Sequence, residues 1–341
     1  MTGIHVPFAP SGGRAKRARA SKGGLGWCVV AALVAAVSSA HAADKVRLIV
    51  SQQQAFELFP AEIAQQDGLF KAENLDVSLI YGDGGGNSLQ AILTGSADVI
   101  IGVGTLSVIS SYAKGGALTI IGNYRMGSGD AYWYVPVTSP IKTLKDLDGK
   151  TVAYSRPGSS SHMTLQFVLH DNNINAKPVS AGGFAAARVQ VMSGQIDVAH
   201  AAAPAGLDLL RKGETRIIFT GKDAKGLANH SIRVAAANAD WLAKNHPVAE
   251  RFMRALWKAT VAYYKGGDPM FKRFADKWGI DLQDARRGPE FTPLAEVAPA
   301  PVGNIAGEAK LALEYGFIKA PLTEAQLKKL VNVVYKQPPV K

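Results

Sequence analysis

The chain has 341 residues, of which 47% are hydrophobic and 19% are charged, a composition typical of globular proteins and a length sufficient for two domains. The formal net charge is +11, but five of the basic residues lie in residues 1–42, which contain no acidic residue. The rest of the chain is only mildly basic and has no basic stripe with interleaved aromatic residues. The sequence therefore predicts no nucleic-acid partner.

The N-terminal residues have the pattern of an export signal. A basic segment, Arg14–Lys22, precedes an apolar run from Leu25 to Val37, and Ala40-His41-Ala42 provides a small-x-small cleavage pattern. The apolar run is shorter than the ~20 residues that a membrane-spanning helix needs. We therefore predict that residues 1–42 are a signal peptide, cleaved after Ala42, and that the mature protein is periplasmic.

The only cysteine, Cys28, lies within this predicted signal peptide. Its removal excludes disulfides, thiolate metal sites and a cysteine nucleophile from the mature chain. The sequence contains no Gly-x-Ser-x-Gly elbow, no His-Glu-x-x-His pair and no Walker loop, and its histidines do not have the spacing of metal ligands. We therefore predict no catalytic residue, no cofactor and no metal site.

Apolar periodicity and turn residues predict strands that alternate with helices, which is typical of βαβ units and a mainly parallel sheet. Strands are expected at residues 46–51, 75–81, 99–101, 118–122, 151–154, around 179, 197–199, 216–220 and 231–237. Helices are expected at residues 60–68, 89–93, 105–114, 163–170, 185–192, 203–213, 247–265, 270–278 and 323–335.

The stretch Leu147–Ser161 combines a turn, a strand and a loop rich in glycine and hydroxyl groups before a helix. Backbone N–H groups at a helix N-terminus and the positive end of the helix dipole favour an anion there. Ser159, Ser160 and Ser161 could each donate to such a ligand. The alternative is that they only cap the helix.

One segment recurs at an offset of 99 residues. Gly95-Ser96-Ala97-Asp98-Val99 is repeated as Gly194-Gln195-Ile196-Asp197-Val198, each after a Gly-Gly pair and a predicted short helix and before a predicted strand. We predict that the two segments are the same structural unit used twice.

These motifs, in this order, resemble the periplasmic solute-binding proteins of ABC importers of the nitrate/sulfonate/taurine class, and the related proteins that bind thiamine-pyrimidine precursors. The resemblance covers nearly all of residues 44–335. It is carried by Ala64-Gln65-Gln66-Asp67-Gly68-Leu69-Phe70-Lys71, Gly84-Gly85-Gly86, Leu93-Thr94-Gly95-Ser96-Ala97-Asp98, Leu144-Lys145-Asp146-Leu147-Asp148-Gly149-Lys150-Thr151-Val152 and Ser193-Gly194-Gln195-Ile196-Asp197-Val198.

The resemblance implies an α/β fold of the two-lobe, type II periplasmic-binding kind, with a mainly parallel sheet flanked by helices in each lobe and a ligand cleft between them. We expect lobe 1 to comprise residues 43–136 and 232–341, and lobe 2 to comprise residues 137–231, with two crossover strands. The resemblance also implies a small-molecule ligand, a permease and an ATPase in the inner membrane, and a monomer. The cleft is expected to close on its ligand about hinges near residues 135–137 and 228–233.

Ligands of open α/β sheets lie beyond the carboxyl ends of the strands, and this rule selects the candidate ligand-binding residues. They are Gln53, Phe56, Gly86, Asn87, Ser88, Gly104, Thr105, Tyr124, Arg125, Ser155, Arg156, Ser159, Ser160, Phe184, His200 and His230. Arg125 and Arg156 are candidate partners of an anion, with a solvated loop charge or an interlobe ion pair as the alternative. The aromatic residues could instead pack in the core, and the two histidines could be structural.

The predicted function is capture of a small solute, anionic (sulfonate-, nitrate- or carboxylate-like) or aromatic, and its delivery to the permease. One alternative is an enzyme similar to the fungal pyrimidine-precursor synthases, which share this fold but carry a cysteine-rich motif that the mature chain lacks. The other alternative is a ligand-sensing interaction module.

Overall fold

The computed structural model describes residues 42–82 and 85–339. The predicted signal peptide and its cleavage site fall almost entirely outside the described residues and remain predictions. Within the described ranges, no helix is both long enough and apolar enough to cross a membrane.

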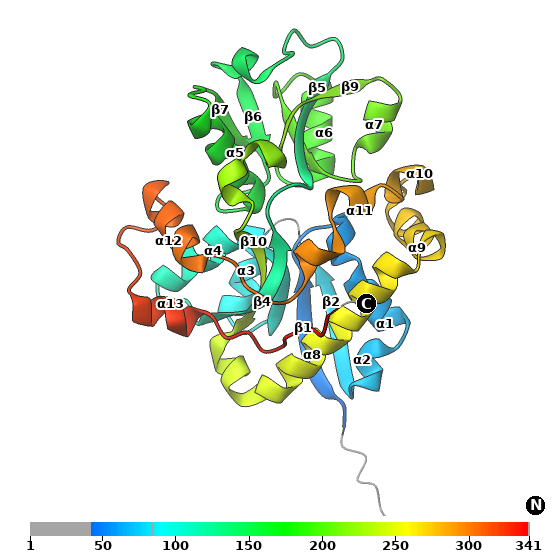
Figure 1. Ribbon diagram of the computed structural model, residues 1–341, viewed down its shortest axis with the longest axis vertical. Helices are drawn as coiled ribbons and strands as arrows, with labels where there is room; N and C mark the ends of the chain where they lie inside the picture. The colour runs from blue at the N-terminus through cyan, green and yellow to red at the C-terminus, as the bar shows by residue number, and fades with distance from the viewer. Residues whose placement is uncertain (1–41, 83–84, 340–341) are drawn as a thin grey trace, which may run out of the picture. The chain divides into compact units, whose positions relative to one another are not determined.

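The strands form one large and two small sheets (Figure 1). Their bounds are β1 (Asp44–Val50), β2 (Leu75–Tyr81), β3 (Val99–Gly104), β4 (Leu118–Met126), β5 (Ala131–Pro136), β6 (Thr151–Tyr154), β7 (Lys177–Ser180), β8 (Ala199–Ala202), β9 (Thr215–Thr220) and β10 (Ser231–Asn238).

The large sheet has five strands in the order β2-β1-β3-β10-β4. β1 pairs in parallel with β2 and β3, whereas β10 is antiparallel to both β3 and β4. The late strand β10 is thus inserted between two early strands. This insertion places residues more than a hundred positions apart in the sequence side by side.

The other strands form a three-stranded antiparallel sheet, β8-β5-β9, and a parallel pair, β6-β7. The predicted α/β class is confirmed, but the strand pairing is mixed rather than mainly parallel. β10 is antiparallel to β3 and β4, and β5 is antiparallel to β8 and β9, so neither of the sheets that contain them is parallel throughout.

Helices cover both faces of the five-stranded sheet. Their bounds are α1 (Pro60–Gln66), α2 (Leu69–Ala72), α3 (Gly85–Leu93), α4 (Thr105–Ala113), α5 (Ser160–Asp171), α6 (Phe184–Met192), α7 (Leu207–Arg211), α8 (Ala239–Lys265), α9 (Asp268–Trp278), α10 (Leu282–Ala285), α11 (Gly288–Phe291), α12 (Ile305–Glu314) and α13 (Glu324–Leu330). Short 3₁₀ turns are η1 (Phe56–Leu58), η2 (Leu144–Leu147), η3 (Gly221–Asp223), η4 (Lys225–Leu227) and η5 (Leu294–Val297).

The apolar side chains of the sheet alternate between two cores. Val46, Leu48 and Val50 of β1 pack with α1, α2, α8 and α9, whereas Ile49 packs on the opposite side with α3 and α4. Successive side chains of a strand point to opposite faces, so a strand buried on both sides needs an uninterrupted apolar run. A third core lies under β5, β8 and α6.

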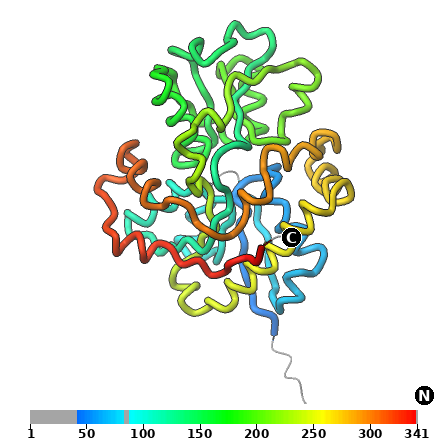
Figure 2. Tube along the Cα trace, in the orientation of Figure 1, coloured from blue at the N-terminus to red at the C-terminus, as the bar shows by residue number. Residues whose placement is uncertain are grey.

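The strands fall into two sets: the five-stranded sheet is the first, and the two small sheets together are the second. The chain passes between these two sets twice, as the reader can follow in Figure 2. It leaves the five-stranded sheet after β4 and returns after η4 into β10. Because β5 hydrogen-bonds to β8 and β9, strand pairing groups residues 131–136 with the second set. The division into two lobes at the predicted residues remains a proposal.

Three predicted helices differ most from the structure in their bounds. α7 covers only Leu207–Arg211 because Gly206 before it has a left-handed φ of 82°. α13 stops at Leu330, not 335, because the chain becomes extended: Asn332 N donates to Ile120 O at 2.9 Å along the edge strand β4. α8 begins at residue 239 rather than 247 and is kinked at Asn245.

The repeated segment is one structural unit used twice. Gly95 and Gly194 each end a helix with a positive φ, 71° and 75°. Asp98 accepts from Arg47 N of β1 at 2.8 Å, and Asp197 accepts from Thr151 N of β6 at 2.8 Å. In both copies the aspartate ties the start of the following strand to the backbone of an earlier strand, β1 in the first copy and β6 in the second.

Candidate functional site: a cavity between the two sets of strands

A cavity lies between the five-stranded sheet and the strands β5, β6 and β8. Its volume, measured as the space open to the centre of a water molecule, is about 40 Å³. One water needs roughly 10–15 Å³ by this measure, so the cavity has room for a small solute or a few waters. It is lined by Ser51, Gln52, Ala55, Glu57, Leu58, Gly102, Gly104 and Arg233 from one side and by Ala131, Ser155, Ser159, Ser160, Ser161, Phe184, His200, Ala201 and Ala202 from the other.

The N-terminus of α5 opens onto this cavity. Ser159 is the N-cap: its side chain accepts from His162 N at 3.2 Å. The N–H groups of the first turn have no partner within the helix, and the dipole makes this end partly positive. The helix start therefore favours an anionic or strongly polar group in the cavity.

Hydroxyl groups at this helix start are held in place by one another. Ser161 Oγ accepts from Ser155 N at 3.0 Å and lies 3.1 Å from Ser155 Oγ and 3.0 Å from Ser159 Oγ. Each hydroxyl can donate or accept a hydrogen bond, so these three hydroxyls can adjust to a ligand group that accepts or to one that donates.

His200 on β8 contributes a polar side chain without a hydrogen-bond partner to the cavity lining. The side chain is 1% exposed, and neither ring nitrogen has a hydrogen-bond partner. Burial lowers the pKa of His200 to about 3, so the ring is neutral at physiological pH. A neutral imidazole offers one donor and one acceptor, and here both lack a protein partner. Phe184 lies edge-on to the ring, with centroids 5.7 Å apart.

Arg233 on β10 connects the two sides of the cavity. Its Nε donates to Ser160 Oγ at 2.9 Å, its Nη1 donates to Glu57 Oε1 at 2.8 Å, and its Nη2 lies 2.8 Å from Asp130 Oδ2. The guanidinium therefore joins the five-stranded sheet, the 3₁₀ turn η1 and the N-terminus of α5.

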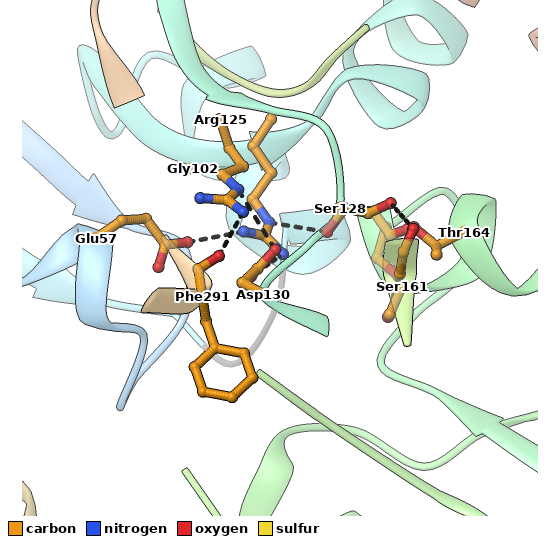
Figure 3. A network of polar contacts seen from close by, with 12 residues as sticks. Glu57, Gly102, Arg125, Ser128, Asp130, Ser161, Thr164 and Phe291 are labelled. Atoms are coloured by element: carbon orange, nitrogen blue, oxygen red, sulfur yellow. Dashed lines mark hydrogen bonds and ion pairs between the residues drawn. The ribbon is translucent and has the colours of Figure 1, made fainter. Parts of the chain in front are cut away.

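Asp130 lies beside two buried arginines, of which Figure 3 labels Arg125. It pairs with Arg233 and also with Arg125, whose Nε lies 3.5 Å from Asp130 Oδ1. Burial alone would raise the pKa of Asp130, but Arg233 and Arg125 together hold it below its ordinary value. Asp130 is therefore the ionised counter-charge of the pair.

Comparison with known proteins identifies the family. A family model described as "NMT1/THI5 like" matches residues 56–266, more than half of the chain. The chain belongs to the NMT1/THI5-like family. No curated protein matches its sequence.

Solved structures confirm the fold expected of an NMT1/THI5-like chain. The periplasmic aliphatic sulphonate-binding protein SsuA of Escherichia coli matches with a TM-score of 0.70 at 19% identity, over 87% of this chain and 95% of that chain. The alkanesulfonate-binding protein SsuA of Xanthomonas axonopodis pv. citri, bound to MOPS, matches with a TM-score of 0.72 at 21% identity, over 86% and 100%. A Candida albicans gene product with the generic periplasmic binding protein fold matches with a TM-score of 0.70 at 17% identity, over 87% and 98%. The predicted periplasmic-binding fold is thus confirmed.

In the described part of this NMT1/THI5-like chain, six of the predicted site residues lie together around the cavity. Those that line the cavity are Gly104, Ser155, Ser159, Ser160, Phe184 and His200. Five of them come from the ends of β3 and β6 and from the starts of α5 and α6, where the strand-end rule places ligands, and His200 lies on β8.

Other predicted residues lie elsewhere, with partners of their own. Arg125 is fully buried and donates to Phe291 O at 2.8 Å. His230 pairs with Glu308 at 3.1 Å. Phe56 packs on Tyr263 in the core, with centroids 4.7 Å apart. The structure also places Tyr124, which donates to Glu57 O, and Thr105, which donates to Ser231 O, outside the cavity lining.

The remaining predicted residues lie beside the cavity or outside the described side chains. Gln53 and Arg156 adjoin the lining residues Gln52 and Ser155 without lining the cavity themselves. Ser88 is buried in α3. Gly86 and Asn87 belong to α3, but their side chains are outside the described residues.

Two charged residues of the cavity were not predicted, Glu57 and Arg233. Each interrupts an apolar run, Phe56-Glu57-Leu58 and Ile232-Arg233-Val234. Lone charges at such positions are rarely buried without a partner or a function, and that signal could have selected them. No cluster of three or more histidine, cysteine or acidic side chains that could hold a metal is present in residues 42–82 and 85–339.

Proposed function

We propose that this protein is the substrate-binding component of an ABC import system, and that it captures a small anionic solute in the cavity at the N-terminus of α5. One observation carries the proposal: a cavity between two sets of strands combines a helix N-terminus with a buried histidine whose ring nitrogens are both unpaired. Buried polar groups without partners are costly, so they are expected where a ligand satisfies them.

The family and the fold support this role. Both SsuA structures named above are described as sulfonate-binding proteins, and one of them holds the sulfonate MOPS. A sulfonate, nitrate or carboxylate group suits the free N–H groups, serine hydroxyls and neutral histidine of the cavity. The small volume favours a compact solute over an extended one.

A catalytic role is the weaker alternative. The only cysteine of the sequence is Cys28, so residues 42–82 and 85–339 contain no cysteine nucleophile and no cysteine-rich motif. A good general base has a pKa near the working pH. Burial lowers the pKa of His200 to about 3, which is too low for this side chain to act as a general base near neutral pH.

Titration calorimetry on the protein tests the binding role. The panel comprises methanesulfonate, ethanesulfonate, nitrate and acetate, with propanol as an uncharged control. We expect at least one anion to bind and the alcohol not to bind. Native mass spectrometry of protein purified from its own periplasm identifies a co-purified solute. If no anion binds and no solute co-purifies, the proposed function is wrong.

Delivery to a membrane permease and its ATPase is the second part of the proposal. A ligand-sensing module of the same fold would bind the solute equally well, so binding alone does not separate the two roles. Uptake of the bound solute by cells with and without the gene does. Loss of uptake on deletion supports import, and unchanged uptake favours a sensing role. Light scattering should give the mass of a monomer.

A further inference from the structure

Four buried charged side chains meet beside the cavity, and their formal charges cancel. Glu57 and Asp130 are the acids, and Arg125 and Arg233 are the bases. Arg125 and Arg233 are direct cross-strand neighbours on β4 and β10. Like charges at such positions repel, and the two buried acids, together with the half-exposed Glu296 2.8 Å from Arg125 Nη2, offset them when the cavity is empty.

Glu57 is the member of this group that faces the cavity with an unsatisfied atom. Its Oε1 accepts from Arg233 Nη1 at 2.8 Å, while its Oε2 is buried without a hydrogen-bond partner. Asp130, in contrast, does not line the cavity, and each of its oxygens lies within ion-pair distance of an arginine: Oδ2 is 2.8 Å from Arg233 Nη2 and Oδ1 is 3.5 Å from Arg125 Nε.

The groups around Glu57 come from several elements. Those that influence or face it are Arg233 of β10, Asp130 before β5, Arg125 and Tyr124 of β4, Tyr263 and Tyr264 of α8, and His200 of β8 across the cavity. Burial raises the pKa of Glu57, Asp130 adds to this, and the two arginines oppose it without cancelling it. Glu57 therefore accepts a proton more readily than Asp130, whose pKa is lowered.

An anion that enters the cavity adds a negative charge next to these four buried side chains, whose formal charges already sum to zero. An uncompensated buried charge is strongly unfavourable, so a second change must accompany binding. Arg233 is the only basic side chain among the lining residues, and its Nη1 is held by Glu57. An anion that pairs with the Arg233 guanidinium from the cavity therefore competes with the Glu57 carboxylate for this donor.

We propose that binding of an anion in this cavity is coupled to the uptake of one proton by Glu57. The anion takes the Nη1 donor of Arg233, the Glu57 carboxylate accepts a proton from solvent, and the four charges and the ligand together stay neutral. No other bond forms or breaks. This inference rests on the proposed function, because it requires that an anion binds here.

The coupling fixes the direction of the pH dependence. A ligand that favours protonated Glu57 raises the pKa of that residue in the complex. Between the pKa of Glu57 in the empty protein and its pKa in the complex, affinity falls as pH rises, by up to about tenfold per pH unit for one proton. At pH values below both, affinity does not change with pH.

Calorimetry with ethanesulfonate, in buffers of different ionisation enthalpy and from about pH 5 to about pH 9, measures the proton count and the slope. We expect uptake of close to one proton in the pH range where affinity falls. Glu57→Gln should bind ethanesulfonate with little pH dependence and with the affinity of the wild type at acid pH. Glu296→Gln, which removes a half-exposed acid paired with Arg125 outside the cavity, should keep the pH dependence of the wild type.

An infrared difference spectrum of the wild type on addition of ethanesulfonate provides a test that needs no variant to fold. We expect a new band of a protonated carboxylic acid. Binding without proton uptake and without this band would overturn the inference and leave the proposed function intact. So would a Glu57→Gln protein that binds weakly at every pH. Failure of the wild type to bind any anion of the panel would instead overturn the proposed function, and this inference with it.

Discussion

Gly104 at the end of β3 lies directly against Ser160 at the start of α5. A Cβ atom added to Gly104 would come within 3.0 Å of Ser160 N and within 2.8 Å of Gly158 O. Both are backbone atoms, which cannot rotate away. The two sides of the cavity therefore approach as closely as they do because residue 104 has no side chain.

We predict that Gly104→Ala holds the two sides of the cavity apart. Affinity for ethanesulfonate should fall at least tenfold, because ligand groups can no longer be contacted from both sides, while the melting temperature of the empty protein changes little. Calorimetry and small-angle scattering measure the two effects. Gly129→Ala is the matched control, since its added Cβ would come no closer than 3.5 Å to any neighbour. Unchanged affinity in Gly104→Ala would contradict this account.

Ser159 and Ser160 should have separable roles. Ser159 caps α5, so Ser159→Ala should reduce the free energy of unfolding by about 1 kcal/mol. Ser160 Oγ accepts from Arg233 Nε, so Ser160→Ala should weaken anion binding several-fold, because Arg233 loses a contact that orients it. Thermal melts and calorimetry on the two single variants distinguish these effects. An equal loss of stability in both variants, with no change in affinity, would make the loop only a helix cap.

His200→Phe should weaken binding and, at the same time, remove part of the acid sensitivity of the fold. The ordinary pKa of histidine is 6.5 and that of buried His200 is about 3. As pH falls from the first value to the second, the unfolded chain binds a proton that the native protein does not, and the free energy of unfolding decreases. Near pH 4.5 this single group lowers the free energy of unfolding by about 3 kcal/mol.

Urea unfolding of the wild type and His200→Phe, near pH 7 and near pH 4.5, measures this effect. We expect a smaller loss of stability in the variant. His162, whose pKa burial lowers to about 4, remains in both proteins and accounts for a residual loss. Parallel pH dependence in the two proteins would contradict a neutral, buried His200.

Asp130→Asn should be strongly destabilising. It removes the counter-charge between Arg125 and Arg233, which would then face each other across neighbouring strands in a buried environment. We expect the free energy of unfolding to fall by about 3–5 kcal/mol. Asp268→Asn, which breaks an exposed pair with Arg286, should barely change it. Similar urea midpoints for the two variants would show that Asp130 is not the essential counter-charge.

Export can be tested independently of the structure. N-terminal sequencing of protein recovered from the periplasm should begin at Ala43, after the small-x-small pattern at residues 40–42. Recovery of exported, soluble protein that still begins at Met1 would contradict the predicted cleavage.

The sequence by itself determined the α/β class, the repeated unit and the loop Ser155–Ser161. These features depend on local rules: apolar periodicity, glycines with positive φ at helix ends, and a serine cap before a helix. Ser155, Ser159 and Ser160 could be selected because strand ends and helix starts can be located from neighbouring residues alone.

Only the tertiary structure decided which charged residues meet at the cavity. The sequence favoured Arg125 and Arg156 as anion partners, yet it is Arg233 that lines the cavity. The reason is strand order: β10 inserts between β3 and β4, which sets Arg233 opposite Gly104 and beside Arg125. The local sequence around Arg233 contains no information about Arg125, its cross-strand neighbour 108 positions earlier in the chain. Burial, and with it the pKa of Glu57 and His200, follows from that same long-range packing.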